Sequence, residues 1–382
     1  MSGNDKAGQL DEQFDAGKPV PTDQLVMNRD DFDSDEAMEH YFKDHPEAPH
    51  QAYDAYKEEI SASHQQKITI SSQAATGSQV YSLHDLYSEH VVQSAYVGTS
   101  YLYTTQQVDN SEGAYQIITR FPLNGSSLKA QDYMTLGRFG HGETLQWFDH
   151  NGKDYFWVVA KATRVDNPTA SGFDWGTQIA RIQYQAGASV DYTDVPRFSS
   201  INRANNLGTS FGTLKRCEAA LSSSRVHLLI WSMNTSNTVQ FAYYNAEGLN
   251  DILDEQEAQA SKYISAGDPS VVSLCVSSYQ SSDFYNAVKY QSVQGIEFSD
   301  GQAIYISSGG TGKTPVIQKG NWGTTYFIPY AVTIEGGALS NPAVNQVETE
   351  GIQLKGDYVY LNVSLHSGDK SKLIFTVPKN DF

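Results

Sequence analysis

A short motif recurs five times along this chain, and a run of strand-like residues follows each copy. It begins with a polar residue and a small residue, continues through two variable positions, and ends on an apolar residue. The copies lie at residues 93–97, 141–145, 216–220, 294–298 and 350–354. The strands expected after them cover residues 101–105, 155–160, 226–231, 303–307 and 358–363. A motif that recurs in the same order indicates a repeat architecture.

A further expected strand in every unit makes the prediction an all-β, five-bladed β-propeller. These strands cover residues 115–121, 177–184, 238–244, 325–330 and 372–377. Each unit spans roughly 60 residues, which is enough for a four-stranded blade with long loops. The motif starts are 48, 75, 78 and 56 residues apart, so we expect large insertions in the middle blades. The competing interpretation is a two-sheet sandwich whose turns look alike.

The N-terminal segment differs from the rest in charge and pattern. Residues 1–65 hold 16 Asp or Glu and 5 Lys or Arg, a net charge of −11. Helix-like spacing over residues 34–60 is interrupted by two prolines. We therefore expect an acidic arm over residues 1–65, partly helical or mobile, followed by the propeller over residues 66–382. A strand at residues 67–71 would close the ring by joining the C-terminal blade.

Composition narrows the classes of function. The 382 residues carry a formal net charge of −18, which argues against binding nucleic acid. The 24 tyrosines suit β-sheets and surfaces that face sugars. The two cysteines, Cys217 and Cys275, do not make a disulfide framework, and Cys217 is expected to pack in the core. We recognise neither a membrane span nor a secretory signal peptide.

Candidate catalytic residues come from the motifs. Residues 307–314 resemble a P-loop, but Pro315 stands where a helix should begin, so we expect a flexible loop. Glu143 and Glu218 are catalytic candidates, because glycoside hydrolysis needs two carboxyl groups at a defined separation. Glu297 sits one position later in its repeat and should point to the opposite face of its strand. The alternative is that these carboxylates cap strand ends.

The leading polar position of the motif predicts a ring of hydrogen-bonding groups at one end of the channel. Its members are Gln93, His141, Arg216, Gln294 and Glu350. The small residues after them would let the inner strands approach closely. Those residues are Ser94, Gly142, Cys217, Gly295 and Gly351. With Glu143, the ring would bind a polar ligand such as a sugar, or else form a structural belt between blades.

Three aromatic residues near the same loops would add surfaces on which sugars stack. They are Tyr96, Trp147 and Trp175. We expect no cofactor and no metal site, and leave a structural calcium ion open.

The second motif and its surroundings resemble a known family. Residues 140–147 read Gly-His-Gly-Glu-Thr-Leu-Gln-Trp, with Tyr-Phe-Trp-Val at 155–158 and Trp-Gly-Thr-Gln-Ile-Ala-Arg at 175–181. The pattern is similar to the helveticin J family, large heat-labile bacteriocins of lactobacilli, over roughly residues 85–380. The resemblance implies a secreted or cell-surface protein that inhibits related Gram-positive bacteria, and some relatives are thought to associate with the S-layer. It supplies no set of catalytic residues.

The sequence therefore predicts a monomeric, bacteriocin-like propeller that binds cell-envelope glycans or the S-layer of Gram-positive bacteria. One alternative is a glycoside hydrolase on the same fold, acting on cell-wall or other polysaccharide. The other is a structural protein associated with the S-layer.

Overall fold

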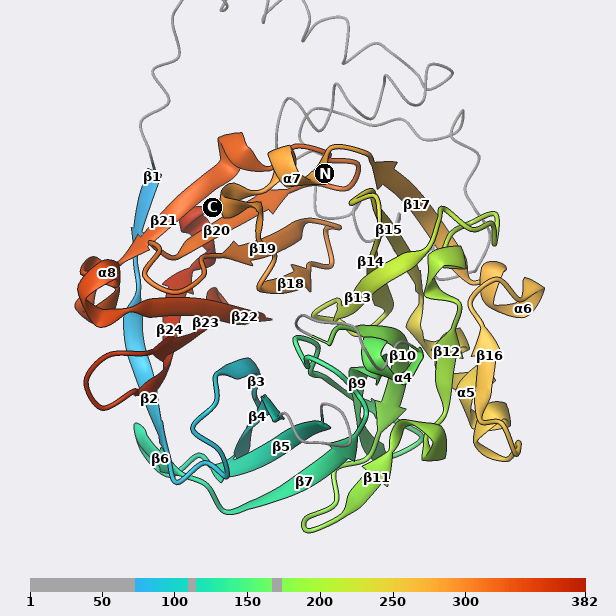
Figure 1. Cartoon of the computed structure of the whole chain (residues 1–382), viewed down its shortest axis with the longest axis horizontal. Coiled ribbons are helices and arrows are strands. Elements are labelled where there is room, and N and C mark those ends of the chain that lie inside the picture. Colours follow the sequence, from blue (N-terminus) through green and yellow to red (C-terminus); the bar gives the residue numbers. More distant parts are fainter. Residues whose placement is uncertain (1–72, 109–114, 167–173) are drawn as a thin grey trace, which may run out of the picture.

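The computed structural model describes residues 73–108, 115–166 and 174–382, which form five β-sheets around a central axis (Figure 1). This architecture is a five-bladed β-propeller, so the predicted fold class is confirmed and the two-sheet sandwich is wrong. The expected arm over residues 1–65, its helical part and the strand at residues 67–71 lie outside the described residues.

Each blade is an antiparallel meander that starts near the axis and ends at the rim. Blade 1 contains β3 (Val92–Val97), β4 (Tyr101–Val108), β5 (Tyr115–Pro122) and β7 (Asp132–Gly137). Blade 2 contains β8 (Gln146–His150), β9 (Lys153–Ala162), β10 (Gly176–Ile182) and β12 (Arg197–Ser199). Blade 3 contains β13 (Leu214–Leu221), β14 (His227–Asn234), β15 (Val239–Asn245) and β17 (Cys275–Ser281). Blade 4 contains β18 (Gly295–Phe298), β19 (Ile304–Ser308), β20 (Val316–Gly320) and β21 (Ala331–Glu335). Blade 5 contains β22 (Val347–Lys355), β23 (Tyr358–Leu365), β24 (Lys372–Pro378) and β2 (Ser78–His84).

The N-terminal part of the described chain closes the ring. Strand β2 pairs antiparallel with β24, so the last blade combines strands from both ends of the sequence. Closure by an N-terminal strand is as expected, although the strand that the structure shows is β2, downstream of residues 67–71. Pairing both edges removes the free strand edges that promote aggregation.

Short parallel strands extend the outer edge of four blades, and the next blade in the ring supplies each of them. They are β11 (Ser189–Asp191) on β7, β16 (Tyr263–Ser265) on β12, β1 (Gln73–Thr76) on β21 and β6 (Ser127–Lys129) on β2. These exchanges join neighbouring blades at the rim through backbone hydrogen bonds.

One expected strand is wrong. Residues 325–330 do not form the third strand of blade 4, and β20 takes that place. Residues Ile328–Tyr330 instead form a short 3-10 helix with Pro329 in its first turn. Proline has no backbone N–H to donate to a sheet, so this apolar and aromatic run cannot act as an interior strand.

The hydrophobic core consists of five clusters, one at each interface between neighbouring blades. Strand β14 is buried along its whole length because both of its faces pack against other blades. Cys217 lies fully buried between blades 2 and 3, as expected, and both cysteines are free. The longest helix among the described residues, α5 (Ala246–Glu257), packs Leu249 and Leu253 into the same cluster.

The remaining helices are short turns in the connections. They are α4 (Thr163–Asp166), α6 (Pro269–Val272), α7 (Phe284–Ala287) and α8 (Pro342–Asn345). Within the described ranges, no helix combines the length and apolar character that crossing a membrane requires.

Candidate functional site

The inner strands bring the recurring motif to the axis. Four copies lie on or directly before β3, β13, β18 and β22, and the fifth forms the loop before β8. A Cβ atom added to Gly295 would lie 2.7 Å from the Cα of Gly351. A Cβ atom on Gly351 would lie 2.9 Å from the carbonyl oxygen of Gln93. These contacts confirm that small residues in the motif allow neighbouring inner strands to pack backbone against backbone.

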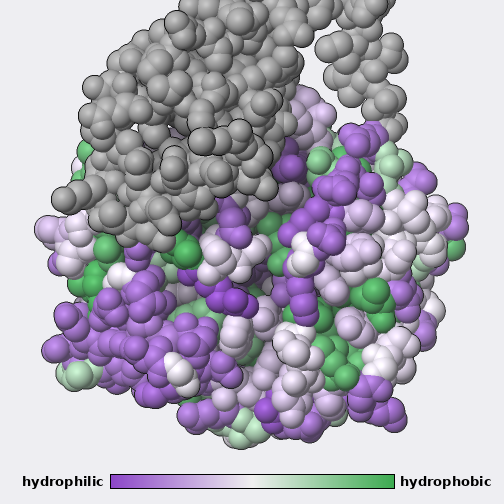
Figure 2. Space-filling view, turned by 180° about the vertical axis from the view of Figure 1, so that it is seen from behind, coloured by the Kyte–Doolittle hydropathy of each residue, from purple (hydrophilic) through white to green (hydrophobic). Residues whose placement is uncertain are grey.

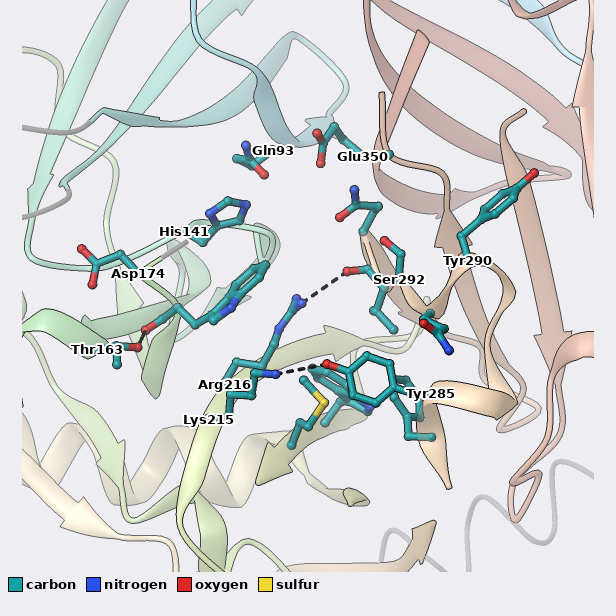
Figure 3. A pocket seen from close by; sticks show the side chains of 18 of the residues that line it. Gln93, His141, Thr163, Asp174, Lys215, Arg216, Tyr285, Tyr290, Ser292 and Glu350 are labelled. Carbon is teal, nitrogen blue, oxygen red and sulfur yellow. Dashed lines mark hydrogen bonds between the residues drawn. The ribbon is translucent and has the colours of Figure 1, made fainter. Parts of the chain in front are cut away.

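A cavity of about 920 Å³ lies at the end of the channel where these motifs begin. All five residues of the expected ring line it: Gln93, His141, Arg216, Gln294 and Glu350. Figure 3 shows four of them around one space, contributed by different blades. The structure thus brings the ring together, and its role in binding a ligand stays a prediction.

Arg216 and Trp175 form the central contact of the cavity wall. The guanidinium carbon of Arg216 lies 3.7 Å from the centroid of the Trp175 ring. The ring of His141 packs on the other side of this pair, with its centroid 4.4 Å from that of Trp175. Trp175 is half-buried, so part of its ring faces the cavity. A flat aromatic surface beside a cation is therefore fixed in place before any ligand arrives.

Glu143 and Glu218 hold Arg216 from behind the cavity wall. Arg216 donates to Glu143 and, at 3.3 Å, to Oε1 of Glu218, and Thr144 donates to Oε2 of Glu218 at 2.6 Å. Burial raises the pKa of both carboxyl groups and Arg216 opposes it. One guanidinium cannot neutralise two buried carboxylates, so the pair favours keeping a proton. Neither residue lines the cavity, so their geometry is that of positioning residues for Arg216.

Glu350 and Gln93 lie on the opposite part of the wall. Among the described residues, Oε2 of Glu350 and Oε1 of Gln93 have no hydrogen-bond partner, although both side chains are buried. Burial raises the pKa of Glu350 well above its ordinary value, and the nearby Glu348 adds to the shift. The shift favours the neutral form of the carboxyl group, which can both donate and accept hydrogen bonds.

Loops outside the motif supply further lining residues that sequence reasoning missed. Lys215 donates to the hydroxyl of Tyr285 at 3.1 Å, and Lys313 comes from the loop that resembles a P-loop. Tyr290 and Gln291 have φ angles of 58° and 55°, a left-handed conformation that is costly for two consecutive residues other than glycine. These two positive φ angles give the loop the shape with which it lines the cavity, but no sequence motif predicts it.

Two of the three expected aromatic residues lie elsewhere. Tyr96 and Trp147 stack on each other with centroids 6.0 Å apart, and Arg225 lies over Trp147. Neither lines the cavity; Trp147 lines a separate hollow near Ser224. The reason is distance along the chain. Tyr96 follows Gln93 by three residues, and at about 3.3 Å per residue it lies far along the inner strand.

Like Glu143 and Glu218, Glu297 does not line the cavity, and its expected position on the opposite strand face from those two stays a prediction. Its carboxyl accepts from Nε2 of Gln146 at 2.5 Å and from the backbone N–H of Leu354 at 3.3 Å. Burial raises the pKa of Glu297 to about 8, against the lowering effect of these hydrogen bonds. The folded protein therefore binds a proton here that the unfolded chain releases between its ordinary pKa and about pH 8.

We expect this proton to make stability fall as pH rises through that window. From pH 6 to pH 7 the wild-type free energy of unfolding should drop by about 1 kcal/mol more than that of Glu297→Gln, because a bound proton contributes about 1.4 kcal/mol per pH unit. Urea unfolding of both proteins at each pH measures the difference. The exposed variant Glu255→Gln is the control and should follow the wild type. Parallel pH profiles for wild type and Glu297→Gln would contradict a raised pKa.

Comparison with known proteins adds a family match over most of the chain. The family described as "Bacteriocin helveticin-J" matches residues 64–379. Bacteriocin helveticin-J of Lactobacillus helveticus is 28% identical over 322 residues, which cover 74% of this chain and 88% of that protein.

Solved structures give only distant matches. An exo-β-1,3-galactanase of Phanerochaete chrysosporium aligns with a TM-score of 0.42 and 8% identity over 80% of this chain. The match covers 64% of that enzyme's chain, which is less than two thirds of its length. A GH43_1 enzyme of Xanthomonas citri, solved with xylotriose, aligns with a TM-score of 0.39 and 10% identity, covering 80% of this chain and 90% of that one. At these values the likeness carries no information about activity.

Proposed function

Because this chain belongs to the helveticin-J family of bacteriocins, we propose that it is a secreted or surface-bound bacteriocin whose axial cavity binds a carbohydrate of the bacterial cell envelope. The family match bears out the resemblance noted at residues 140–147. The target envelope would be that of Gram-positive bacteria related to the producer, with the S-layer as a second place of attachment.

The glycan proposal rests on one observation: an aromatic surface and a hydrogen-bonding surface face each other across the cavity. One wall is the Trp175 ring, held by Arg216 and His141. The other carries the amide of Gln93 and the carboxyl group of Glu350, whose raised pKa favours its neutral form. Pyranose rings have an apolar face and a rim of hydroxyl groups, so an aromatic surface facing hydrogen-bonding groups suits them. The cavity volume of about 920 Å³ is at the upper end of ordinary ligand sites and would accommodate more than one sugar unit.

A structural belt is the weaker interpretation of the same ring. A belt would pair its polar atoms with one another, whereas Gln93 and Glu350 each keep an oxygen without a partner in the described part of the chain. Buried polar atoms are nearly always paired, and hydroxyl groups of a ligand would supply the missing partners.

The test is binding to purified cell walls of lactobacilli. Trp175→Ala should weaken binding by at least about 10-fold, the effect of losing an anchor residue worth more than 1 kcal/mol. Trp147→Ala is the matched control, because it removes the same side chain outside the cavity and should bind as the wild type does. Thermal unfolding of each variant shows whether it is folded. Equal wall binding by folded Trp175→Ala and wild type would contradict the proposal.

Hydrolysis is the second candidate, and one observation favours it. Glu350 lies on the cavity wall with a raised pKa, which a general acid requires. Glu348 lines the same cavity and could supply the second carboxyl group, in place of Glu143 and Glu218. Release of soluble sugars from walls by the wild type, and its loss in Glu350→Gln, would establish an enzyme.

A further inference from the structure

We propose that His150, Glu247 and Asp251 form a binding site for one divalent transition-metal ion of the Zn²⁺ type, between blade 2 and helix α5. One ligand atom from each of these residues lies within 4.8 Å of the others. The site is separate from the axial cavity, which none of the three residues lines. His150 ends β8, and both acids lie on α5, which follows blade 3 strand β15.

The His150 side chain is the feature that distinguishes this group from an ordinary acidic patch. It is only 1% exposed, yet its Nδ1 makes no hydrogen bond to any residue that the structure describes. Nδ1 lies 3.5 Å from Oε2 of Glu247, so it points into the group. A buried ring nitrogen facing carboxylates without a hydrogen bond needs either a proton or a metal ion.

The other ring nitrogen favours the metal. Nε2 of His150 lies 2.9 Å from Oδ2 of Asp254. Oδ1 of the same acid accepts from the guanidinium of Arg181, so Asp254 is paired with a cation as a carboxylate. A carboxylate only accepts, and therefore Nε2 carries the proton and Nδ1 keeps its lone pair. Nδ2 of Asn151 lies 3.0 Å from the same ring nitrogen and donates to Oδ2 of Asp254 at 3.4 Å.

A carboxylate that fixes the far nitrogen of a metal-binding histidine is a recurrent arrangement in zinc sites. Here Asp254 plays that part, while Glu247 and Asp251 lie one helical turn apart and present their oxygens on the same side of α5. Both acids are exposed and can rotate to close the distances to the roughly 2.0–2.2 Å bonds that zinc forms. Imidazole with two carboxylates suits a transition metal better than Ca²⁺, which prefers oxygen alone.

The site would fasten α5 to blade 2. Arg181 already joins the two by donating to Asp254 and, at 3.0 Å, to the carbonyl of Asn250. Figure 2 shows hydrophilic residues gathered on the side of the molecule where Figure 1 places α5, so a metal ion would reach this site from solvent. A bound ion would thus stabilise the interface between blades 2 and 3 beyond what Arg181 supplies.

The experiment is calorimetric titration of untagged, chelator-stripped full-length protein with Zn²⁺. We expect the wild type to have a site whose affinity is weakened at least about 100-fold in Glu247→Gln/Asp251→Asn, since even outer partners of metal sites matter by 10–100-fold. Glu255→Gln, exposed on the same helix, is the matched control and should bind as the wild type does. Zn²⁺ should also raise the melting temperature of wild type and control but not of the double variant, and Ca²⁺ should do neither.

The comparison between variants is needed because four of the ten histidines lie within residues 1–72 and can hold Zn²⁺ on their own. Such binding is the same in all three proteins and does not enter the difference. Equal Zn²⁺ binding by the wild type and the double variant, or no Zn²⁺ binding by the wild type, would overturn the proposal.

Discussion

Replacing Arg216 with methionine is expected to lower the free energy of unfolding at pH 7.5 by about 3–5 kcal/mol, the usual loss when one partner of a buried ion pair is removed. Arg216 is the cation that both Glu143 and Glu218 contact in the structure. All three side chains are at most 5% exposed, so water cannot solvate the two carboxyl groups that lose their cationic partner in the variant. Methionine keeps the unbranched apolar stem of the side chain and removes only its charged end. Urea unfolding followed by tyrosine and tryptophan fluorescence measures the loss.

Two further measurements test whether the loss of stability comes from the two carboxyl groups that are left without a cation. Their pKa values are already raised by burial and rise further once Arg216 is gone. The folded variant then binds more protons than the unfolded chain above pH 5, so its stability falls as pH rises and recovers on acidification. The loss should therefore be smaller at pH 5 than at pH 7.5. Adding Glu143→Gln and Glu218→Gln to Arg216→Met should restore most of the stability. A loss below 1 kcal/mol at pH 7.5 would show that the carboxylates have other partners.

The fold class could be predicted from the sequence because one short motif recurs once for every blade. The motif lies at the inner strands, where only small residues fit between neighbouring backbones. Each blade has one inner strand, so five copies of the motif predict five blades. The strand expected at residues 325–330 is wrong because the prediction followed the strand-like composition of the segment and overlooked one residue. Pro329 cannot take part in the interior of a sheet. The closing strand was expected on the correct principle, and the structure shows that role in β2.

The candidate site was predictable only where it follows the repeat. Positions equivalent in every blade must lie around the axis, which placed Gln93, Arg216 and Glu350 together. Lining residues from irregular loops, such as Lys313 and Tyr290, have no equivalent in other blades and leave no periodic signal. Tyr96 and Trp147 lie outside the cavity for a related reason, because proximity in sequence to the motif says nothing about which end of a strand a side chain occupies.

The group at His150 lay beyond any pattern in the sequence. His150 precedes Glu247 and Asp251 by about 100 positions, and only the packing of α5 against blade 2 joins it to them. Metal sites formed across blades in this way have no spacing signature, so the expectation of no metal site stays a prediction, which the titration with Zn²⁺ tests.

The crowding of the inner strands predicts the second large effect, on Gly351. Gly351→Val is expected to lower the free energy of unfolding by about 3 kcal/mol, the upper part of the usual range for overpacking a core. Its new Cβ atom would lie 2.9 Å from the carbonyl oxygen of Gln93 and 3.0 Å from the Cα of Ser94. Both contacts are backbone atoms of the neighbouring blade, so relief requires blades 5 and 1 to separate. The matched control is Gly301→Val, because Gly301 has ordinary φ and its nearest neighbour would be 3.9 Å away. Urea unfolding should show a change below about 0.5 kcal/mol for that exposed site. Equal stabilities for the two variants would mean that the inner strands yield at no cost and that the small position of the motif is not needed to close the ring.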